Sequence, residues 1–240
     1  MNINNNTLIS EIVAENYDTA TVFKKYGIDF CCNGERTINE VANTKNVSVA
    51  KLIQEISLIE INTIASQSYQ NWDLDFLSDY IYQNHHLYIE KRGPEIIAYL
   101  EKLCKVHGKN HPELFEVIEL FKEAVGDLAM HMKKEELILF PHIKKIAKAS
   151  RQEQTFEIPP FGSIENPIRM MHSEHDNEGE RFRRISELTN NYEAPKDACN
   201  TYKIAFILLK EFEDDLHKHI HIENNILFKK AITLENQLNK

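Results

Sequence analysis

Two segments of this 240-residue chain carry a histidine four residues before a glutamate, as His131-x3-Glu135 and His219-x3-Glu223. Residues four apart project from the same side of an α-helix. Both glutamates also fall on apolar stripes, at positions where a leucine would be expected. Because an unpaired buried carboxylate is costly, each glutamate must find protons, cations or a metal ion. The two pairs therefore predict a buried site built from imidazoles and carboxylates.

The two pairs belong to an internal repeat. The segment HMKKEELILF at 131–140 aligns with HIHIENNILF at 219–228 at a constant offset of 88 residues. An offset of 89 places His86 on His175, so each half has a lone core-facing histidine on its first helix. Two such hairpins packed face to face bring together four imidazoles and two carboxylates, which predicts a dinuclear metal site. This set of ligands favours iron over zinc or manganese.

The stripes that carry these residues predict an all-α protein. Core-facing positions alternate four and three residues apart over Leu114–Ile146, and a second stripe runs over Tyr202–Ile226. Region 73–236 holds four helical segments joined by modest loops, which indicates an antiparallel four-helix bundle. Its first helix is expected to kink or break at Gly93-Pro94. Ferritin-like bundles use Glu-x-x-His and more carboxylates, so the histidine-first order favours a hemerythrin-like bundle.

The first 60 residues predict a small, separate helical domain, and 61–72 reads as a polar linker. Asp18 is a candidate N-cap, and Gly27 is suited to end the helix that follows. Thr37-x-x-Glu40 has the pattern of a capping box at the start of a further helix.

Cys31 and Cys32 are a second chemical feature. They follow a predicted helix end and lie between two glycines, which indicates exposure and reactivity. Adjacent cysteines can bind a metal, react with oxidants or form a small apolar pair, and the residues leave these alternatives open. We therefore regard Cys31 and Cys32 as redox or accessory candidates.

The remaining histidines have simpler explanations. His107 is expected near a helix end, in a capping role, and His142 is expected to be a packed core residue. Glu174 and Asp176 flank His175 and either orient a metal ligand or carry surface charge. The histidines off the stripes are expected to be solvated: His85, His111, His172, His217 and His221.

Composition and charge exclude several classes of function. Lys+Arg is 28 and Asp+Glu is 37, so the net charge of −9 argues against nucleic-acid partners and against polybasic membrane binding. The longest apolar run, Ile204–Leu209, is far shorter than the ~20 residues of a membrane-spanning helix. No signal peptide is visible at the N-terminus, so a cytoplasmic location is expected. No glycine-rich nucleotide-binding motif is present.

Several motifs together resemble one known family. Tyr26–Gly34 (YGIDFCCNG) resembles the signature of the ScdA-type N-terminal domain. His131–Pro141, Ser173–Asp176 and Asp214–Asn225 are similar to motifs of the hemerythrin-like domain of the same proteins. The family is the iron–sulfur cluster repair di-iron proteins of the ScdA/YtfE (RIC) type, and the resemblance covers nearly the whole chain.

The resemblance implies a cytoplasmic homodimer that supplies iron to proteins whose iron–sulfur clusters were damaged by nitrosative or oxidative stress. It also implies a non-haem di-iron centre with an oxo or hydroxo bridge. The implied ligands are His86 and His131 on one iron, His175 and His219 on the other, and Glu135 and Glu223 as bridges. His85 is next to His86 and leaves the choice between the two open.

Two alternative functions stay open for such a centre. A reduced dinuclear iron site with an open position can consume nitric oxide or peroxide, which would make the protein an enzyme rather than a stoichiometric iron donor. A hemerythrin-like oxygen or redox sensor is expected to carry an output domain, and none is recognisable in this sequence. We therefore expect iron donation ahead of enzymatic turnover.

Overall fold

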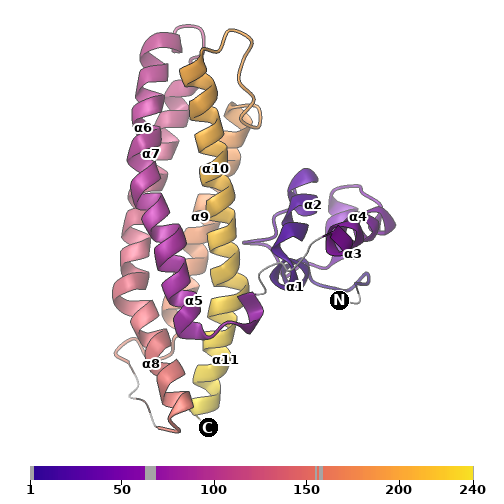
Figure 1. Cartoon of the computed structure of the whole chain (residues 1–240), viewed down its shortest axis with the longest axis vertical. Helices are drawn as coiled ribbons and strands as arrows, with labels where there is room; N and C mark the ends of the chain where they lie inside the picture. Colours follow the sequence, from indigo (N-terminus) through magenta and orange to yellow (C-terminus); the bar gives the residue numbers. More distant parts are fainter. Residues whose placement is uncertain (1–2, 63–68, 155, 157–158, 240) are drawn as a thin grey trace.

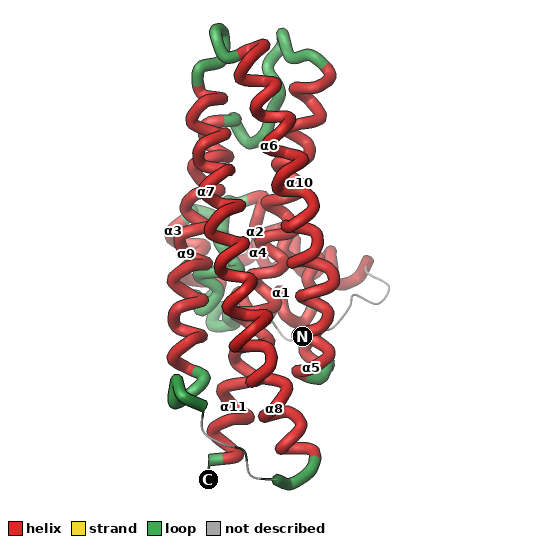
Figure 2. Tube along the Cα trace, turned by 90° about the vertical axis from the view of Figure 1, so that its left-hand side faces the viewer, coloured by secondary structure: helices red, strands yellow, loops and turns green. Residues whose placement is uncertain are grey.

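The computed structural model describes residues 3–62, 69–154, 156 and 159–239. Four long helical rods lie side by side in an antiparallel bundle, which confirms the predicted all-α fold class (Figure 1, Figure 2). The described residues contain no β-strand, only an isolated bridge between Leu8 and Thr37. Among the helices of this part of the chain, none combines the length and the apolarity needed to cross a membrane.

Three of the four rods consist of two α-helices joined by a π-helical turn. The first rod comprises α5 (Leu74–Ile81), η3 (Tyr82–His86) and α6 (Leu87–His107). The second comprises α7 (Glu113–Lys134), η4 (Glu135–Leu139) and α8 (Phe140–Arg151). The third is α9 (Glu165–Leu188), which has no π-turn. The fourth comprises α10 (Asn200–Ile222), η5 (Glu223–Leu227) and α11 (Phe228–Leu238).

Each π-turn coincides with one of the predicted metal ligands. His86 is the last residue of η3, Glu135 is the first of η4, and Glu223 is the first of η5. Such turns are rare inside α-helices and concentrate at functional sites. The irregular backbone of the bundle is therefore found where the sequence predicts chemistry.

Apolar side chains of the stripes form the core on either side of these turns. The rings of Phe121, Phe182 and Phe212 come from α7, α9 and α10 and lie 5.1–6.2 Å apart between centroids. The break expected at Gly93-Pro94 does not occur, because α6 continues through Pro94 to His107. Gly93 is buried against Val125 of α7, where an added Cβ would lie 2.9 Å from Cγ1. The helix therefore continues through this stretch, packed against α7, although Pro94 lacks an N–H donor.

The N-terminal unit is built from short helices: α1 (Ile9–Glu15), η1 (Tyr17–Thr19), α2 (Ala20–Lys25), α3 (Ile38–Thr44) and α4 (Val49–Asn62). Helix α1 is absent from the sequence prediction. The predicted cap Asp18 is wrong, because Asn16 Oδ1 accepts the Asp18 N–H instead. The Thr37–Glu40 capping box is confirmed. Gly27 follows α2 with a φ of 60°, which suits glycine.

The predicted linker at 61–72 is only partly covered by the structure. Helix α4 extends to Asn62, residues 63–68 lie outside the described part, and η2 (Tyr69–Asn71) precedes the bundle. Tyr69 is buried, with Trp72 packed edge-on at 4.9 Å. The domain boundaries at 60 and 73 stay predictions.

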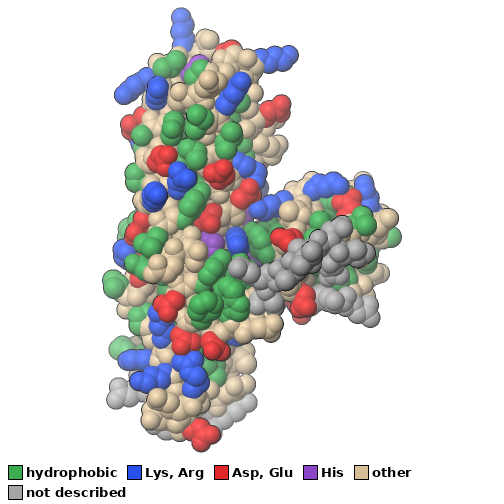
Figure 3. All heavy atoms as spheres, in the orientation of Figure 1, with side chains coloured by type: hydrophobic (Ala, Val, Ile, Leu, Met, Phe, Trp, Pro, Cys, Tyr) green, Lys and Arg blue, Asp and Glu red, His purple; other side chains and the backbone are tan. Residues whose placement is uncertain are grey.

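The N-terminal unit docks on one side of the bundle through the loop that follows α2 (Figure 1, Figure 3). Asn225 Nδ2 donates to the carbonyl oxygens of Phe30 at 3.3 Å and Cys31 at 3.2 Å. The Phe30 ring lies 5.9 Å from the His221 ring, and Lys24 forms an ion pair with Asp214 at 2.7 Å. Helix α2 and the loop that follows it therefore join the two units by both polar and aromatic contacts.

A carboxyl group is buried beside this interface. Glu213 of α10 is only 8% exposed and helps to line a cavity of about 630 Å³ between the N-terminal unit and the bundle. Burial raises the pKa of Glu213 to about 7, although the charge of Lys210 acts in the opposite direction. The folded protein therefore binds this proton more tightly than the unfolded chain does.

We predict that Glu213 makes folding stability fall as pH rises. Its folded pKa of about 7 exceeds the ordinary value of 4.5, so its favourable contribution is complete below pH 4.5 and is lost as pH rises through 7. The substitution Glu213→Gln should flatten this dependence by on the order of 3 kcal/mol in urea unfolding between pH 4.5 and 8. The matched control is Glu211→Gln on the exposed face of α10. Identical pH profiles for Glu213→Gln and the wild type would contradict the assignment.

Candidate metal centre

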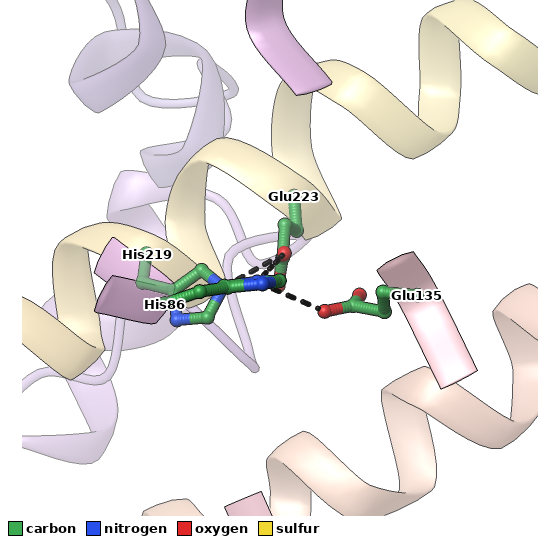
Figure 4. A group of neighbouring side chains, drawn as sticks. All are labelled: His86, Glu135, His219 and Glu223. Atoms are coloured by element: carbon green, nitrogen blue, oxygen red, sulfur yellow. Dashed lines mark hydrogen bonds and ion pairs between the residues drawn. The ribbon is translucent and has the colours of Figure 1, made fainter. Parts of the chain in front are cut away.

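Six buried side chains from all four rods meet in the middle of the bundle. The structure brings together two groups, each with ligand-type atoms within 4.8 Å of one another. The first group is His86, Glu135, His219 and Glu223, and Figure 4 shows these side chains converging. The second group is His131, Glu135, His175 and Glu223. Both glutamates belong to both groups, which is the arrangement that two bridged metal ions require.

The distances place each carboxylate between histidines of the two groups. Glu223 Oε1 lies 2.8 Å from His219 Nε2, and its Oε2 lies 3.2 Å from His175 Nε2. Glu135 Oε2 lies 3.3 Å from His86 Nε2 and 3.4 Å from His131 Nε2. Each carboxylate therefore contacts one histidine of each group.

The grouping of the histidines differs from the expected pairing. The family resemblance implied His86 with His131 and His175 with His219, whereas the structure groups His86 with His219 and His131 with His175. The rings of His131 and His175 lie 4.7 Å apart, and those of His86 and His219 lie 5.0 Å apart. Each pair therefore forms across the hairpins, between the first and fourth rods for His86 and His219 and between the second and third rods for His131 and His175.

The six side chains of the two groups are called the histidine cluster below. His86, and not its neighbour His85, belongs to it. His85 is also buried, but its Nδ1 is 3.0 Å from Asp215 and its ring stacks on His219 at 5.4 Å. The expectation that His85 is solvated is therefore wrong. His85 therefore contacts His219 from beside the cluster but belongs to neither group.

The other predicted histidine roles have mixed outcomes. His221 is buried and not solvated, because the docked loop covers it, and His217 is half-buried beside Phe30. His142 is a packed residue as predicted, with Nε2 3.1 Å from Glu235. His107 ends α6 as expected, with Nε2 3.2 Å from Cys199 Sγ. The last two expected to be solvated are half-buried: His111 and His172.

Three polar side chains hold the far nitrogen of a cluster histidine. Glu136 accepts from His86 Nδ1 at 3.0 Å, Glu174 from His131 Nδ1 at 2.7 Å, and Asn224 from His175 Nδ1 at 2.8 Å. Partners of this kind fix the tautomer and direction of a metal-binding imidazole.

Only part of this supporting network was expected from the sequence. Glu174 was expected beside His175 but orients His131, and Asp176 is exposed. Glu136 and Asn224 were missed, although both follow a predicted bridging glutamate and match each other at the repeat offset of 88. That equivalence is the signal that would have found them.

The charges of the two glutamates and of the neighbouring histidines shift one another's pKa values. Burial and the charge of Glu223 act to raise the pKa of Glu135, but the contacts with His131 and His86 lower it overall. Burial acts likewise on Glu223, and His219 and His175 hold its pKa well below the usual range. Burial acts to lower the pKa of His131, yet Glu135 and Glu174 raise it to about 10. The cluster therefore favours ionised carboxylates facing positive charge.

Several cluster atoms lack a well-directed hydrogen bond among the described residues. They are His86 Nε2, His219 Nδ1, both carboxylate oxygens of Glu135, and Glu223 Oε2. Buried unpaired polar atoms of this kind carry a penalty that a bound cation would remove. Imidazole and carboxylate donors suit a divalent transition metal, so the residues fit a metal ion in each group.

A cavity of about 610 Å³ between α7 and α9 reaches His131 and His175.

The cysteine pair lies close to this cluster, on the docked loop. Cys31 is buried and Cys32 is half-buried, so the expected exposure is wrong for Cys31. The neighbouring Cys32 thiol and burial raise the pKa of Cys31, which does not favour a reactive thiolate. The reason is tertiary, because the loop packs against the bundle instead of facing water.

Comparison with known proteins matches both parts of the chain. Residues 78–231 match the model of the hemerythrin HHE cation binding domain, and residues 5–60 match a domain of unknown function, DUF542. The chain is 30% identical over 228 residues to the iron-sulfur cluster repair protein ScdA of Staphylococcus haemolyticus, covering 95% of this chain and 99% of that protein. It is 31% identical over 212 residues to the iron-sulfur cluster repair protein YtfE of Yersinia pseudotuberculosis, covering 88% of this chain and 90% of that protein.

We predict that Cys199, and not the cysteine pair, is the fastest thiol to alkylate at pH 7. Cys199 is exposed at the N-terminus of α10, and hydrogen bonds from Tyr202 N–H and His107 lower its pKa to about 7. It should react about five to ten times faster than an ordinary cysteine with iodoacetamide, followed by peptide mass mapping. Cys199→Ser should remove the fast phase and His107→Ala should slow it. Earlier labelling of Cys31 or Cys32 would contradict this ranking.

Proposed function

Because the chain belongs to the ScdA/YtfE family of iron–sulfur cluster repair proteins, we propose that it repairs damaged clusters by supplying iron from a non-haem di-iron centre in its bundle. The proposed ligands are His86 and His219 for one ion, His131 and His175 for the other, with Glu135 and Glu223 as bridges.

The observation that carries this proposal is the sharing of both glutamates by the two histidine groups. A single structural metal ion would need four ligands in one shell, whereas here six side chains form two overlapping shells. The mixture of imidazole and carboxylate donors suits iron, and it lacks the thiolates that would hold a metal most firmly. Such a site is suited to an ion that must later leave.

The chain's own residues supply orientation and proton balance. Glu136, Glu174 and Asn224 aim three imidazoles at the centre, so that each Nε2 faces a carboxylate. In the metal-free protein the raised pKa of His131 keeps it protonated, and that proton must leave before its Nε2 can bind a metal. Bound iron would supply an exchangeable divalent ion that can also change its oxidation state.

The cavity between α7 and α9 is the natural path between the cluster and water. Lys134 and Glu174 form an ion pair beside it, and Glu174 also holds His131. Movement of Glu174 toward Lys134 would therefore loosen the support of one proposed ligand at the mouth of the path.

The family resemblance adds further parts to this proposal. They are action in nitrosative and oxidative stress, a cytoplasmic location, an oxo or hydroxo bridge between the irons, and a homodimer.

Metal analysis tests the proposed ligands. The purified chain should hold about two irons and show a near-ultraviolet oxo-to-iron band that dithionite bleaches. Glu135→Ala or Glu223→Ala should reduce the iron to below one per chain, because each removes a ligand from both groups. Glu213→Gln is the matched control, since it alters a buried carboxyl outside the cluster. Zinc in place of iron, or less than half a metal per chain after reconstitution, would overturn the proposal.

A di-iron reductase for nitric oxide or peroxide is the alternative function, and the cavity that reaches His131 and His175 favours it. We predict that the reduced, iron-loaded chain transfers at most its own two irons to an apo-cluster acceptor and then stops. Acceptor absorbance and metal content of the separated proteins give the stoichiometry, with the Glu223→Ala variant as the unloaded control. Sustained consumption of nitric oxide with a reductant, without loss of iron, would favour the reductase instead.

A further inference from the structure

We propose that Asp29, Cys31 and Cys32 form a second metal site, for one thiophilic divalent cation such as Fe²⁺, beside the cluster in the bundle. Their ligand-type atoms all lie within 4.8 Å of one another. Cys31 Sγ is 3.9 Å from Cys32 Sγ and 3.4 Å from Asp29 Oδ1. This group shares no residue with the two histidine groups.

The distances agree with tetrahedral coordination. Metal–sulfur bonds of ~2.3 Å place two sulfurs of a tetrahedron about 3.8 Å apart, and a carboxylate oxygen at ~2.1 Å lies about 3.6 Å from each sulfur. The observed separations of 3.9 and 3.4 Å are therefore close to two edges of such a site. Two thiolates and one carboxylate leave the fourth position open for water or for a ligand from another molecule.

A cavity independently gives this group access to water. The cavity of about 630 Å³ at the interface is lined by Asp29 and Cys31 from the loop and by Gly179 and His217 from the bundle. Gly179 has no side chain, and a Cβ at this position would lie 3.6 Å from Cys32 Sγ. The bundle therefore leaves space beside the cysteine pair while it covers the rest of the loop.

The proposed site is adjacent to the histidine cluster. Cys32 Sγ lies 3.6 Å from the carbonyl oxygen of His175. Asn224 contacts both sites, because its Oδ1 accepts from His175 Nδ1 at 2.8 Å and its Nδ2 donates to the Cys31 carbonyl at 3.2 Å. Asn224 therefore connects the loop directly to a proposed iron ligand.

This adjacency suggests the use of the site as a relay between the bundle and a client protein, a role that rests on the proposed iron supply. Binding needs no redox step: a divalent cation takes two thiolates, and the two thiol protons go to water. The ion would pass from imidazole and carboxylate donors to softer thiolates, which are also the ligands of iron–sulfur clusters.

Titration of the full, iron-loaded chain with Co²⁺ tests the site. The wild type should bind one further equivalent with thiolate-to-cobalt charge-transfer absorption in the near ultraviolet. The double variant Cys31→Ser/Cys32→Ser should lose this absorption, and the matched variant Cys104→Ser/Cys199→Ser should keep it. Asp29→Asn retains an acceptor oxygen for the loop N–H groups, and it should weaken Co²⁺ binding at least tenfold. Absence of the band in the wild type, or its persistence in the Cys31/Cys32 variant, would overturn the site.

Iron content separates this inference from the proposed function. A Cys31/Cys32 variant that keeps two irons shows that the bundle is folded, and its iron transfer to an apo acceptor should then be at least fivefold slower. Unchanged transfer would overturn the relay. A wild type with two irons and no cobalt–thiolate band would refute the second site alone. A thiolate band in a chain that cannot hold iron in the bundle would refute the iron supply alone.

Discussion

Two carboxylates buried at the centre of a helical bundle are the constraint on which the rest of this structure depends. Glu135 and Glu223 have no exposed surface, and burial alone would drive both toward the neutral acid. Four imidazoles gathered from four rods oppose that tendency and hold the carboxylates ionised. The outer contacts from Glu136, Glu174 and Asn224 then follow, because each imidazole must present one particular nitrogen inward.

The π-turns show how a regular bundle accommodates this polar centre. Apolar stripes on both sides of the cluster need continuous helices, whereas the six polar side chains must all point to the same centre. The helix widens into a π-turn at His86, at Glu135 and at Glu223, and each rod continues as an α-helix beyond that turn. His175 reaches the same centre from the regular helix α9, so the two halves of the repeat are similar but not identical.

Docking of the N-terminal unit extends the polar network beyond the bundle. Asn224 and Asn225 follow Glu223, and both donate to carbonyl oxygens of the loop near the cysteine pair. The loop thereby covers His221, while a cavity at the interface reaches Cys31. The position of the loop and the direction of His175 are tied to one side chain, which links the small unit to the centre physically.

The sequence by itself determined the four-helix architecture and the six residues that meet, because periodicity, repeat offset and the cost of burying a carboxylate are all local or pairwise properties. Tertiary structure decided which histidines pair, since contact between rods sets that choice and spacing along one helix does not. It also decided the burial of His85, His221 and Cys31, because the surfaces that cover them come from segments far away in the chain. Sequence patterns describe one helix at a time, and these features depend on what packs against it.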